Sequence, residues 1–334
     1  MTIRTGVVGA GIMGADHAEN LARNIGGSTL ACVADIDGER AKAAASALGA
    51  RAVTDPLELI HDDGVDAVVI ASHDSTHPEL VQACLDAGKP VLCEKPLAST
   101  ADEARRIVDA ERAVRDERGV SLVSVGFMRR FDPGHVELRQ ALAEGGLGRA
   151  LLLHGISRNV SAAPGATSES AVTNSAIHEL DVFPWLLDSP IAEVSWVPGV
   201  LASSEAAPGL QDPAFMMVRL RSGVLATLEL FLNAGHGYST QCEVVGERGT
   251  ARVVEPAVAA YNLERKNYVE YPADWRPRFA EAYRRELQAW VRHLLEGTPS
   301  SLATAEDGLR ATLAADAMVR SMHDGGAFTP VAAL

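Results

Sequence analysis

A glycine-rich stretch near the amino terminus constrains this chain more than any other feature. Residues 6–14 read Gly-Val-Val-Gly-Ala-Gly-Ile-Met-Gly, at the end of an apolar segment, Ile3–Val8, that predicts a buried strand. The pattern suits a tight turn at Gly9, close approach of a pyrophosphate at Gly11 and close helix–strand packing at Gly14. A helix that follows points its free N–H groups and positive dipole end at the phosphates. The stretch predicts a dinucleotide site.

An acidic residue after the next predicted strand indicates which dinucleotide binds. The apolar segment 30–34 ends on Asp35, about 20 residues beyond Gly14, where a carboxylate accepts hydrogen bonds from ribose hydroxyls. A carboxylate there repels a 2′-phosphate, so NAD is favoured over NADP. The alternative is a glycine turn followed by a solvated acid. It is disfavoured because strand, helix and acid occur together.

The first third of the chain alternates predicted strands and helices. Helices are predicted at 15–23, 39–48, 78–87 and 101–117, and buried strands at 65–71, 90–93 and 122–126. Continuous apolar strands are typical of parallel sheets covered by helices on both faces. We therefore predict an α/β Rossmann domain, a doubly wound parallel sheet, over residues 1–126.

Residues 127–334 predict an α+β domain with an open-faced, mainly antiparallel sheet. Its expected strands are 151–156, 192–197, 215–220, 224–231, 241–245 and 250–254, and its expected helices are 134–144, 175–187, 279–296 and 305–323. The last helix can pack back on the first domain. Such a sheet leaves one face without helices. Because Leu228, Leu230, Phe231 and Leu232 must be hidden, we predict a homodimer or homotetramer that pairs through this face.

Composition excludes several classes of protein. The net charge of −14 argues against nucleic acid or an anionic membrane as partner. No apolar run approaches the roughly 20 residues of a membrane helix, and the first strand leaves no room for a signal peptide. Cys32, Cys84, Cys93 and Cys242 lie apart in apolar surroundings. We expect free, mostly buried thiols and a cytoplasmic location.

A lysine follows one of the predicted parallel strands. Glu94-Lys95-Pro96 lies at the carboxyl end of the strand 90–93, where ligands bind in such sheets. Pro96 favours an extended Lys95, and the bond between them can be cis. Lys95 can donate a hydrogen bond to a substrate hydroxyl or carbonyl oxygen. A surface ion pair with Glu94 is an equally good interpretation of the position alone.

A histidine lies among polar residues farther along. On a helix, Asn174, His178 and Asp181 share one face, since residues three and four apart are neighbours. Such a histidine can take the proton of an alcohol whose carbon surrenders a hydride. The alternative is a core histidine bonded to Asp181. A metal site at His178, Glu179 and Asp181 is disfavoured because Glu179 points away from the shared face, so no metal is predicted.

Further cofactor contacts are expected in the loop after the strand 65–71. Ser72, His73 and His77 lie there, although solvated loop polarity explains them as well. The complete predicted cofactor-binding set is Gly9, Gly11, Ile12, Met13, Gly14, Asp35, Ser72, His73, His77, Glu94 and Lys95.

Together these motifs resemble the Gfo/Idh/MocA oxidoreductase family, and most closely its inositol 2-dehydrogenases. Further matching segments are Gly-Phe-Met-Arg-Arg-Phe-Asp at 126–132, Ser-Arg-Asn at 157–159, His-Glu-Leu-Asp-Val at 178–182, Gln-Cys-Glu-Val-Val-Gly-Glu at 241–247 and Phe-x-x-x-Tyr-x-x-Glu at 279–286. The resemblance implies NAD-linked oxidation of one ring hydroxyl of a small polyol, a cyclitol or a pyranose, to a ketone. It implies that Lys95 binds the hydroxyl oxygen and His178 is the general base. The residues implied to orient the substrate are Arg129, Asn159, Asp181, His236 and Tyr283.

Two departures from the family pattern fall on the substrate side. Asn174 replaces an Asp that can both orient a catalytic imidazole and stabilise its protonated form. A less basic His178 is expected, which suits alkaline pH or the reducing direction. His236 stands where a Tyr is common. A modified inositol or a sugar therefore fits as well as myo-inositol, and a sugar dehydrogenase or keto-sugar reductase remains an alternative. A non-catalytic NAD-binding or sensing protein is favoured by Asn174 alone and opposed by Lys95 and His178.

Overall fold

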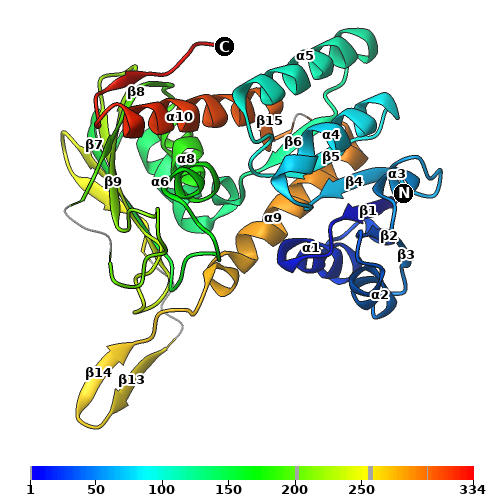
Figure 1. Cartoon of the computed structure of the whole chain (residues 1–334), viewed down its shortest axis with the longest axis horizontal. Coiled ribbons are helices and arrows are strands. Elements are labelled where there is room, and N and C mark those ends of the chain that lie inside the picture. Colours follow the sequence, from blue (N-terminus) through cyan, green and yellow to red (C-terminus); the bar gives the residue numbers. More distant parts are fainter. Residues whose placement is uncertain (1, 200–202, 255–258, 299) are drawn as a thin grey trace. The chain divides into compact units, whose positions relative to one another are not determined.

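A computed structural model of the chain describes residues 2–199, 203–254, 259–298 and 300–334 (Figure 1). They form two compact units. The first comprises the described part of Met1–Met128 and Ala282–Thr312 with Leu334, and the second comprises that of Arg129–Glu281 and Leu313–Ala333. The chain therefore returns to its first unit, and the division is not the single boundary after residue 126 that the sequence suggests.

The sheet of the first unit has the predicted doubly wound order. The strands are β1 (Ile3–Val8), β2 (Ser28–Ala34), β3 (Arg51–Val53), β4 (Ala67–Ile70), β5 (Val91–Glu94), β6 (Val123–Gly126) and β15 (Ala303–Thr304). They lie in the order β15-β6-β5-β4-β1-β2-β3, and all except β15 are parallel. The strand order reverses between β1 and β4, where such sheets bind their ligands.

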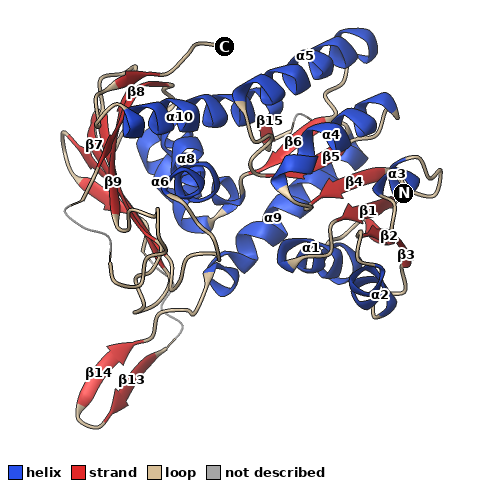
Figure 2. Cartoon of the chain, in the orientation of Figure 1, coloured by secondary structure: helices blue, strands red, loops and turns tan. Residues whose placement is uncertain are grey.

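Helices surround this sheet (Figure 2). They are α1 (Ile12–Arg23), α2 (Gly38–Ser46), α3 (Pro56–Ile60), the 3₁₀ turn η1 (Asp74–Thr76), α4 (His77–Asp86) and α5 (Ala101–Arg118). Caps explain two of the starts, because the side chain of Asp37 accepts from the backbone at the start of α2 and Thr100 does so for α5. The short elements β3 and α3 were not predicted. The predicted helices are otherwise present with ends shifted by a few residues.

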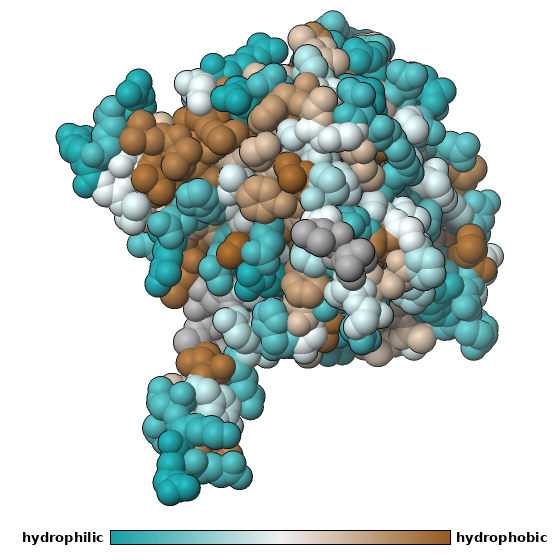
Figure 3. All heavy atoms as spheres, turned by 60° about the vertical axis from the view of Figure 1, so that its left-hand side comes forward, coloured by the Kyte–Doolittle hydropathy of each residue, from teal (hydrophilic) through white to brown (hydrophobic). Residues whose placement is uncertain are grey.

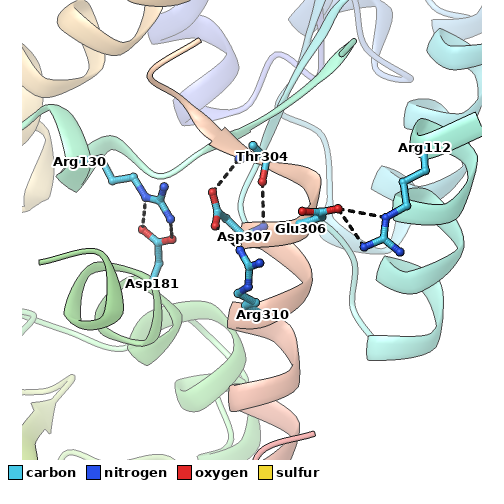
Figure 4. Close-up of polar contacts among 7 residues, drawn as sticks. All are labelled: Arg112, Arg130, Asp181, Thr304, Glu306, Asp307 and Arg310. Carbon is cyan, nitrogen blue, oxygen red and sulfur yellow. Dashed lines mark hydrogen bonds and ion pairs between the residues drawn. The ribbon is translucent and has the colours of Figure 1, made fainter. Parts of the chain in front are cut away.

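Late residues complete the first unit. Ala303 and Thr304 pair antiparallel with Val125 and Ser124 of β6. Thr304 and Asp307 exchange backbone and side-chain hydrogen bonds of 3.0 and 3.1 Å, which cap the helix that follows (Figure 4). Glu306, which precedes Asp307, forms a 2.9 Å ion pair with Arg112 of α5. The predicted Rossmann domain therefore lacks one edge strand without these residues.

The second unit contains the predicted mainly antiparallel sheet. The strands are β7 (Ala150–Arg158), β8 (Ile191–Val197), β9 (Ala214–Leu220), β10 (Leu225–Phe231), β11 (Ser239–Gly246), β12 (Thr250–Arg252) and β16 (Thr329–Pro330). They lie in the order β12-β11-β7-β10-β9-β8-β16, and among these described strands only β7 and β10 pair in parallel. A separate hairpin, β13 (Ala260–Leu263) and β14 (Lys266–Val269), is exposed along its whole length and was not predicted.

The remaining elements are the 3₁₀ turn η2 (Met128–Phe131), α6 (Pro133–Ala143), α7 (Ser168–Ser170), the π-helix η3 (Ala171–Ala176), α8 (Ile177–Leu187), α9 (Trp275–Glu296) and α10 (Ala305–His323). The helix predicted at 175–187 is therefore α-helical only from Ile177, and it follows a wider π turn. Both α9 and α10 contribute residues to the two units.

The residues on the open face of the second sheet are mostly not the ones that the sequence predicted. Leu228, Leu230 and Leu232 are buried in the core of their own unit, so the prediction that they line the open face is wrong. Only Phe231 of that group points the other way, because side chains alternate along a strand. The open face carries Leu152 and Phe215, both exposed, and hydrophobic side chains gather on this side of the molecule (Figure 3).

The cysteines are free and buried, as predicted. Burial raises the pKa of Cys84 and of Cys242 to about 12, so both remain thiols at neutral pH. Among the helices that the structure describes, none is both long and apolar enough to cross a membrane.

Candidate active site

The glycine turn after β1 has three glycines with three different surroundings. Gly9 has a φ of +91°, and a Cβ there would lie 2.6 Å from the backbone of Ser72. A Cβ on Gly14 would lie 1.7 Å from the carbonyl oxygen of Gly9. Gly11 caps α1 and has nothing within 4 Å of its Cβ position. The turn therefore needs Gly9 and Gly14 for its own packing and leaves space at Gly11 for a ligand.

A cavity of about 1060 Å³ opens at the carboxyl ends of β1, β2 and β4. Gly9, Gly11 and Asp35 line it, together with Ile36, whose side chain is 87% exposed. The Asp35 carboxylate is held in place, because Oδ2 accepts from the backbone N–H of Ala10 at 2.7 Å and Oδ1 accepts from that of Asp37 at 2.9 Å. An open glycine, an anchored acid and an exposed aliphatic residue in one cavity fit the pyrophosphate, ribose and adenine of NAD.

An arginine beside this acid was missed from the sequence. The Nη2 of Arg40, on α2, lies 3.5 Å from Asp35 Oδ1, and Arg40 also lines the cavity. Arginine near the ribose site accommodates a 2′-phosphate in NADP-dependent proteins. The one available signal is the position of Arg40 in the first turn after Asp37, which sequence reasoning did not use.

The loop after β4 places its three predicted residues differently. Ser72 and His73 line the cavity, and His73 also accepts a hydrogen bond from the backbone of Ser75 that caps η1. His77 is not among the lining residues. Its ring is buried, with Nδ1 2.7 Å from the carbonyl oxygen of Pro96 and Nε2 3.2 Å from that of Ser72. Burial lowers the pKa of His77, so its ring is neutral at neutral pH.

The other predicted cofactor residues differ in exposure. Ile12 is exposed and Met13 half-buried in the first turn of α1. Lys95 is half-buried, and its bond to Pro96 is cis.

Glu94 is buried and faces inward, so a surface ion pair does not describe it. Its Oε1 lies 2.7 Å from Nε2 of His17, and its Oε2 accepts from the backbone N–H of Lys95 at 3.2 Å. Burial alone would raise the pKa of Glu94, but the hydrogen bond from His17 and the nearby positive charge of Lys95 lower it below its usual value. Glu94 is therefore a carboxylate at neutral pH.

The helix that carries His178 begins with a change of helix type. Asn174 lies in the π-helix η3 and is exposed, whereas His178 lies in α8 and is half-buried. In a π turn the hydrogen bonds run between residues five apart, so a spacing of four residues is less than one turn. The expectation that these two residues share a face rests on α-helical spacing, which holds only from Ile177 onward. Such π segments are often found at functional sites.

Two acids of α8 form ion pairs inside the second unit. Asp181 is buried and forms a two-pronged pair with Arg130, at 3.0 Å from Nε and 2.5 Å from Nη2 (Figure 4). Glu179 is buried against Arg129, whose guanidinium also lies 5.7 Å from the ring centre of Phe279. Burial raises the pKa of Glu179, and Arg129 opposes that change.

These pairs occupy carboxylate and guanidinium groups predicted to orient substrate. Arg129 and Asp181 have side chains only a few per cent exposed, and both contribute to packing around α8. A role in binding hydroxyl groups remains a prediction for them. Of the pairing partners, Glu179 was considered from the sequence only as part of a disfavoured metal site, and Arg130 was given no role.

The other predicted substrate residues lie on loops and on α9. Asn159 follows β7, where its backbone bonds Phe231 and Ala234 at 2.9 and 2.8 Å. This ties the loop after β7 to the loop that carries His236, which is exposed. Tyr283 is buried in the first unit, with its ring edge-on to His17 at 5.8 Å between centres. Within the described residues, no group of three or more His, Cys, Asp or Glu is placed to hold a metal ion.

Two family models match nearly the whole chain. Residues 3–126 match the NAD-binding Rossmann fold of the Gfo/Idh/MocA oxidoreductases, and residues 139–332 match the C-terminal alpha/beta domain of the same family. The chain belongs to the Gfo/Idh/MocA family and is an NAD-dependent oxidoreductase.

Similar proteins share one substrate class in their names. Inositol 2-dehydrogenase 2 of Paenarthrobacter aurescens (strain TC1) is 55% identical over 331 residues, covering 99% of each chain. The structure of myo-inositol dehydrogenase from Lactobacillus casei with NAD(H) and myo-inositol matches with a TM-score of 0.94 at 29% identity, covering 100% of this chain and 98% of that one. That of scyllo-inositol dehydrogenase from the same species, with NAD(H) and scyllo-inositol, has a TM-score of 0.89 at 26% identity and covers all of both chains.

Proposed function

We propose that this enzyme oxidises one ring hydroxyl of a cyclitol, an inositol or a modified inositol, to the ketone. The observation that carries the proposal is Lys95, half-buried at the carboxyl end of β5 in the sheet that bears the NAD cavity. Full-length similarity to proteins named inositol 2-dehydrogenases supports the substrate class. Bound NAD⁺ supplies the hydride acceptor.

Two residues act on the reacting hydroxyl in this proposal. The ammonium group of Lys95 donates a hydrogen bond to the hydroxyl oxygen, which holds it and stabilises negative charge that develops there. His178 takes the hydroxyl proton as general base while the carbon loses its hydride. Arg129, Asn159, Asp181, His236 and Tyr283 orient the remaining hydroxyls, and the ion pairs of Arg129 and Asp181 keep the surrounding helices fixed.

Asn174 adjusts the basicity of His178. An Asn orients an imidazole without stabilising its positive charge, so His178 is a weaker base than with Asp at this position. This favours alkaline assay conditions or reduction of the ketone. For that reason a keto-sugar reductase of the same family is the second candidate.

The exposed sheet face joins two copies of the chain. Two exposed apolar side chains lie on this face, Leu152 opposite Leu225 of β10 and Phe215 opposite Glu229. Such a surface is covered in stable proteins, and a second copy pairs it through two-fold symmetry as a dimer or within a tetramer. We place the enzyme in the cytoplasm, which is compatible with four buried free thiols.

The experiment measures cofactor reduction with NAD and NADP separately, over a panel of inositols and pyranoses at neutral and alkaline pH. Turnover of an inositol with NAD is expected, with a loss of roughly 10²- to 10⁴-fold in kcat for Lys95→Met and for His178→Asn. Lys42→Met, which removes an exposed lysine of α2, is the control that keeps the wild-type rate. NAD binding without turnover of any compound overturns the oxidation of free inositols and directs the search to ketones reduced by NADH.

A further inference from the structure

A buried histidine contacts Glu94, the residue that precedes the lysine of the proposed mechanism. His17 is in the second turn of α1, 1% exposed, and its Nε2 lies 2.7 Å from Glu94 Oε1. The rings of His17 and of Tyr283 on α9 lie at 74° to each other, with 5.8 Å between their centres. No part of the proposed reaction uses His17, yet it is the only described residue that bonds Glu94 from the cofactor-binding helix.

The hydrogen-bond partner of His17 indicates which nitrogen of its ring carries the proton. An ionised carboxylate only accepts, so the proton of this bond resides on Nε2. Nδ1 is buried, and no hydrogen-bond partner for it occurs among the residues that the structure describes. The ring therefore donates one hydrogen bond, from Nε2, and its other nitrogen is buried without a bond to a described residue. These contacts indicate that the ring holds Glu94 in place.

Glu94 in turn is fixed on its second oxygen. Oε2 accepts from the backbone N–H of Lys95 at 3.2 Å. Gly126, the neighbour of Glu94 on β6, leaves the room for this carboxylate, since a Cβ there would lie 3.3 Å from Oε2. The Glu94 carboxylate therefore links the ring of His17 to the main chain of Lys95.

The other side of Lys95 is held by a second histidine. His77 contacts the carbonyl oxygen of Pro96 at 2.7 Å, so the residues on both sides of Lys95 are bonded to buried imidazoles. The titratable or charged groups around Glu94 are His17, Lys95, His77 and Cys93. His17 and the backbone of Lys95 hydrogen-bond its two oxygens.

We propose that His17 is a positioning residue that fixes the place and charge of Lys95 through Glu94. The proposal rests on the proposed function, in which Lys95 binds the reacting hydroxyl. Because α1 also begins at the open glycine of the turn, one helix bears both the phosphate site and the support of Lys95. Without the donor at position 17, Glu94 gains a proton or rotates, and Lys95 loses a fixed negative neighbour.

The test compares His17→Met, which removes the donor but keeps bulk, with His17→Gln, which restores an N–H donor. His135→Met is the matched control, because His135 is an equally buried histidine bonded to a carboxylate, Asp132, at 2.7 Å in the second unit. Readouts are the melting temperature, NAD affinity, kcat and KM over pH, and acetylation of Lys95 by acetic anhydride over pH, quantified by mass spectrometry. Labelling needs no turnover.

His17→Met should lower kcat roughly tenfold or more at unchanged NAD affinity, and move the onset of Lys95 labelling about one unit to lower pH. His17→Gln should recover most of both, and His135→Met should lower only the melting temperature. Equal labelling and kcat in His17→Met and wild type, with only the melting temperature reduced, overturns the proposal. If His17→Met does not fold, Glu94→Gln tests the same link, since an amide carries no charge to Lys95.

The two proposals fail in different ways. Absence of turnover in the wild type contradicts the proposed function, while the labelling shift still decides the role of His17. Turnover that depends on Lys95 but not on His17 or Glu94 contradicts the inference alone.

Discussion

Backbone geometry determines the residues of the glycine turn in the first unit, whereas side-chain pairing determines those of helix α8 in the second. In the turn, the structure shows directly why Gly9 and Gly14 must be glycine, and it leaves open space at the Cβ position of Gly11. In α8, Asp181, which was predicted to orient substrate, and Glu179 are both paired with arginines of their own unit. Backbone requirements can thus be predicted from spacing, whereas a charged side chain can be satisfied by any partner the fold supplies.

The buried pair of Arg129 and Glu179 offers the largest test of this difference. Arg129→Met should lower the free energy of unfolding by about 3–5 kcal/mol, because it leaves a buried carboxylate without its partner. The double variant with Glu179→Gln should recover most of that loss. Chemical denaturation measures both, and Arg149→Met, which breaks an exposed pair with Glu247, should have little effect. Unchanged stability of Arg129→Met, with only KM raised, would contradict the structural role of the pair and leave Arg129 with its substrate role alone.

Two alanine substitutions separate packing from ligand space in the turn. Gly14→Ala should destabilise the protein by about 1–3 kcal/mol, because its Cβ would lie 1.7 Å from the Gly9 carbonyl oxygen. Gly11→Ala should leave the melting temperature unchanged and weaken NAD binding roughly tenfold or more, about 1.4 kcal/mol. Thermal melts and NAD titration measure these effects. Equal behaviour of the two variants contradicts the separate roles.

The acid that ends β2 determines cofactor preference in a way that Arg40 modifies. Asp35→Ser should shift the ratio of NADP to NAD efficiency by roughly 10- to 100-fold toward NADP, because repulsion is removed and the guanidinium remains. Adding Arg40→Ala should cancel much of the shift. Steady-state kinetics with both cofactors decides the matter, and an unchanged ratio in Asp35→Ser would place the ribose elsewhere.

Acid should weaken the second unit through Asp132. His135 and Arg278 hydrogen-bond this buried carboxylate and, against the effect of burial, hold its pKa well below the usual value. A lowered folded-state pKa adds stability above the unfolded value near 4, and that stability is lost as pH falls below it. Between about pH 4 and pH 3 the loss should approach 1.4 kcal/mol. Denaturation against pH should show a shallower decline for Asp132→Asn; parallel curves contradict this assignment.

The smallest expected effect is at Asn174. Asn174→Asp should move the acidic limb of the kcat/KM profile about one unit to higher pH, because a carboxylate favours the protonated imidazole of His178. Ser175→Asp, one residue along the π-helix, is the positional control. A protein that binds NAD without catalysis stays inactive in both variants. An active enzyme whose profile does not move shows that the π turn directs residue 174 away from His178.

Much of the fold could be predicted because its signals are local. The apolar strand Ile3–Val8 and the helix Ala305–His323 have the predicted ends, and the parallel order of the first sheet follows from the alternation of strands and helices. The hairpin β13–β14 was missed, since its residues bury nothing and carry no apolar alternation. The wrong assignment of Leu228, Leu230 and Leu232 came from counting apolar residues without assigning the two faces by strand parity.

The candidate site was predictable to the extent that backbone geometry defines it. The glycines, Asp35 and the Lys95–Pro96 segment follow from position at strand ends. The buried contacts of His17 and Glu179 depend on which residue a distant element brings opposite each of them, and no spacing rule predicts that. Arg40 was missed although its partner Asp35 lies only five residues away. The π turn before His178 could not be predicted either, because an α-helix is the usual expectation for such a segment.

The pairing of β15 with β6 has a consequence for how the chain is made. During synthesis, β6 emerges early and remains an edge strand with unpaired N–H and C=O groups until Ala303 and Thr304 follow the strands β7–β14. A fragment ending at residue 126 keeps that edge open and is prone to associate. All strands of the second sheet except β16 thus lie between two strands of the first, and β16 follows β15. An exchange of the second unit between relatives therefore requires three junctions, one after β6, one before β15 and one within α10.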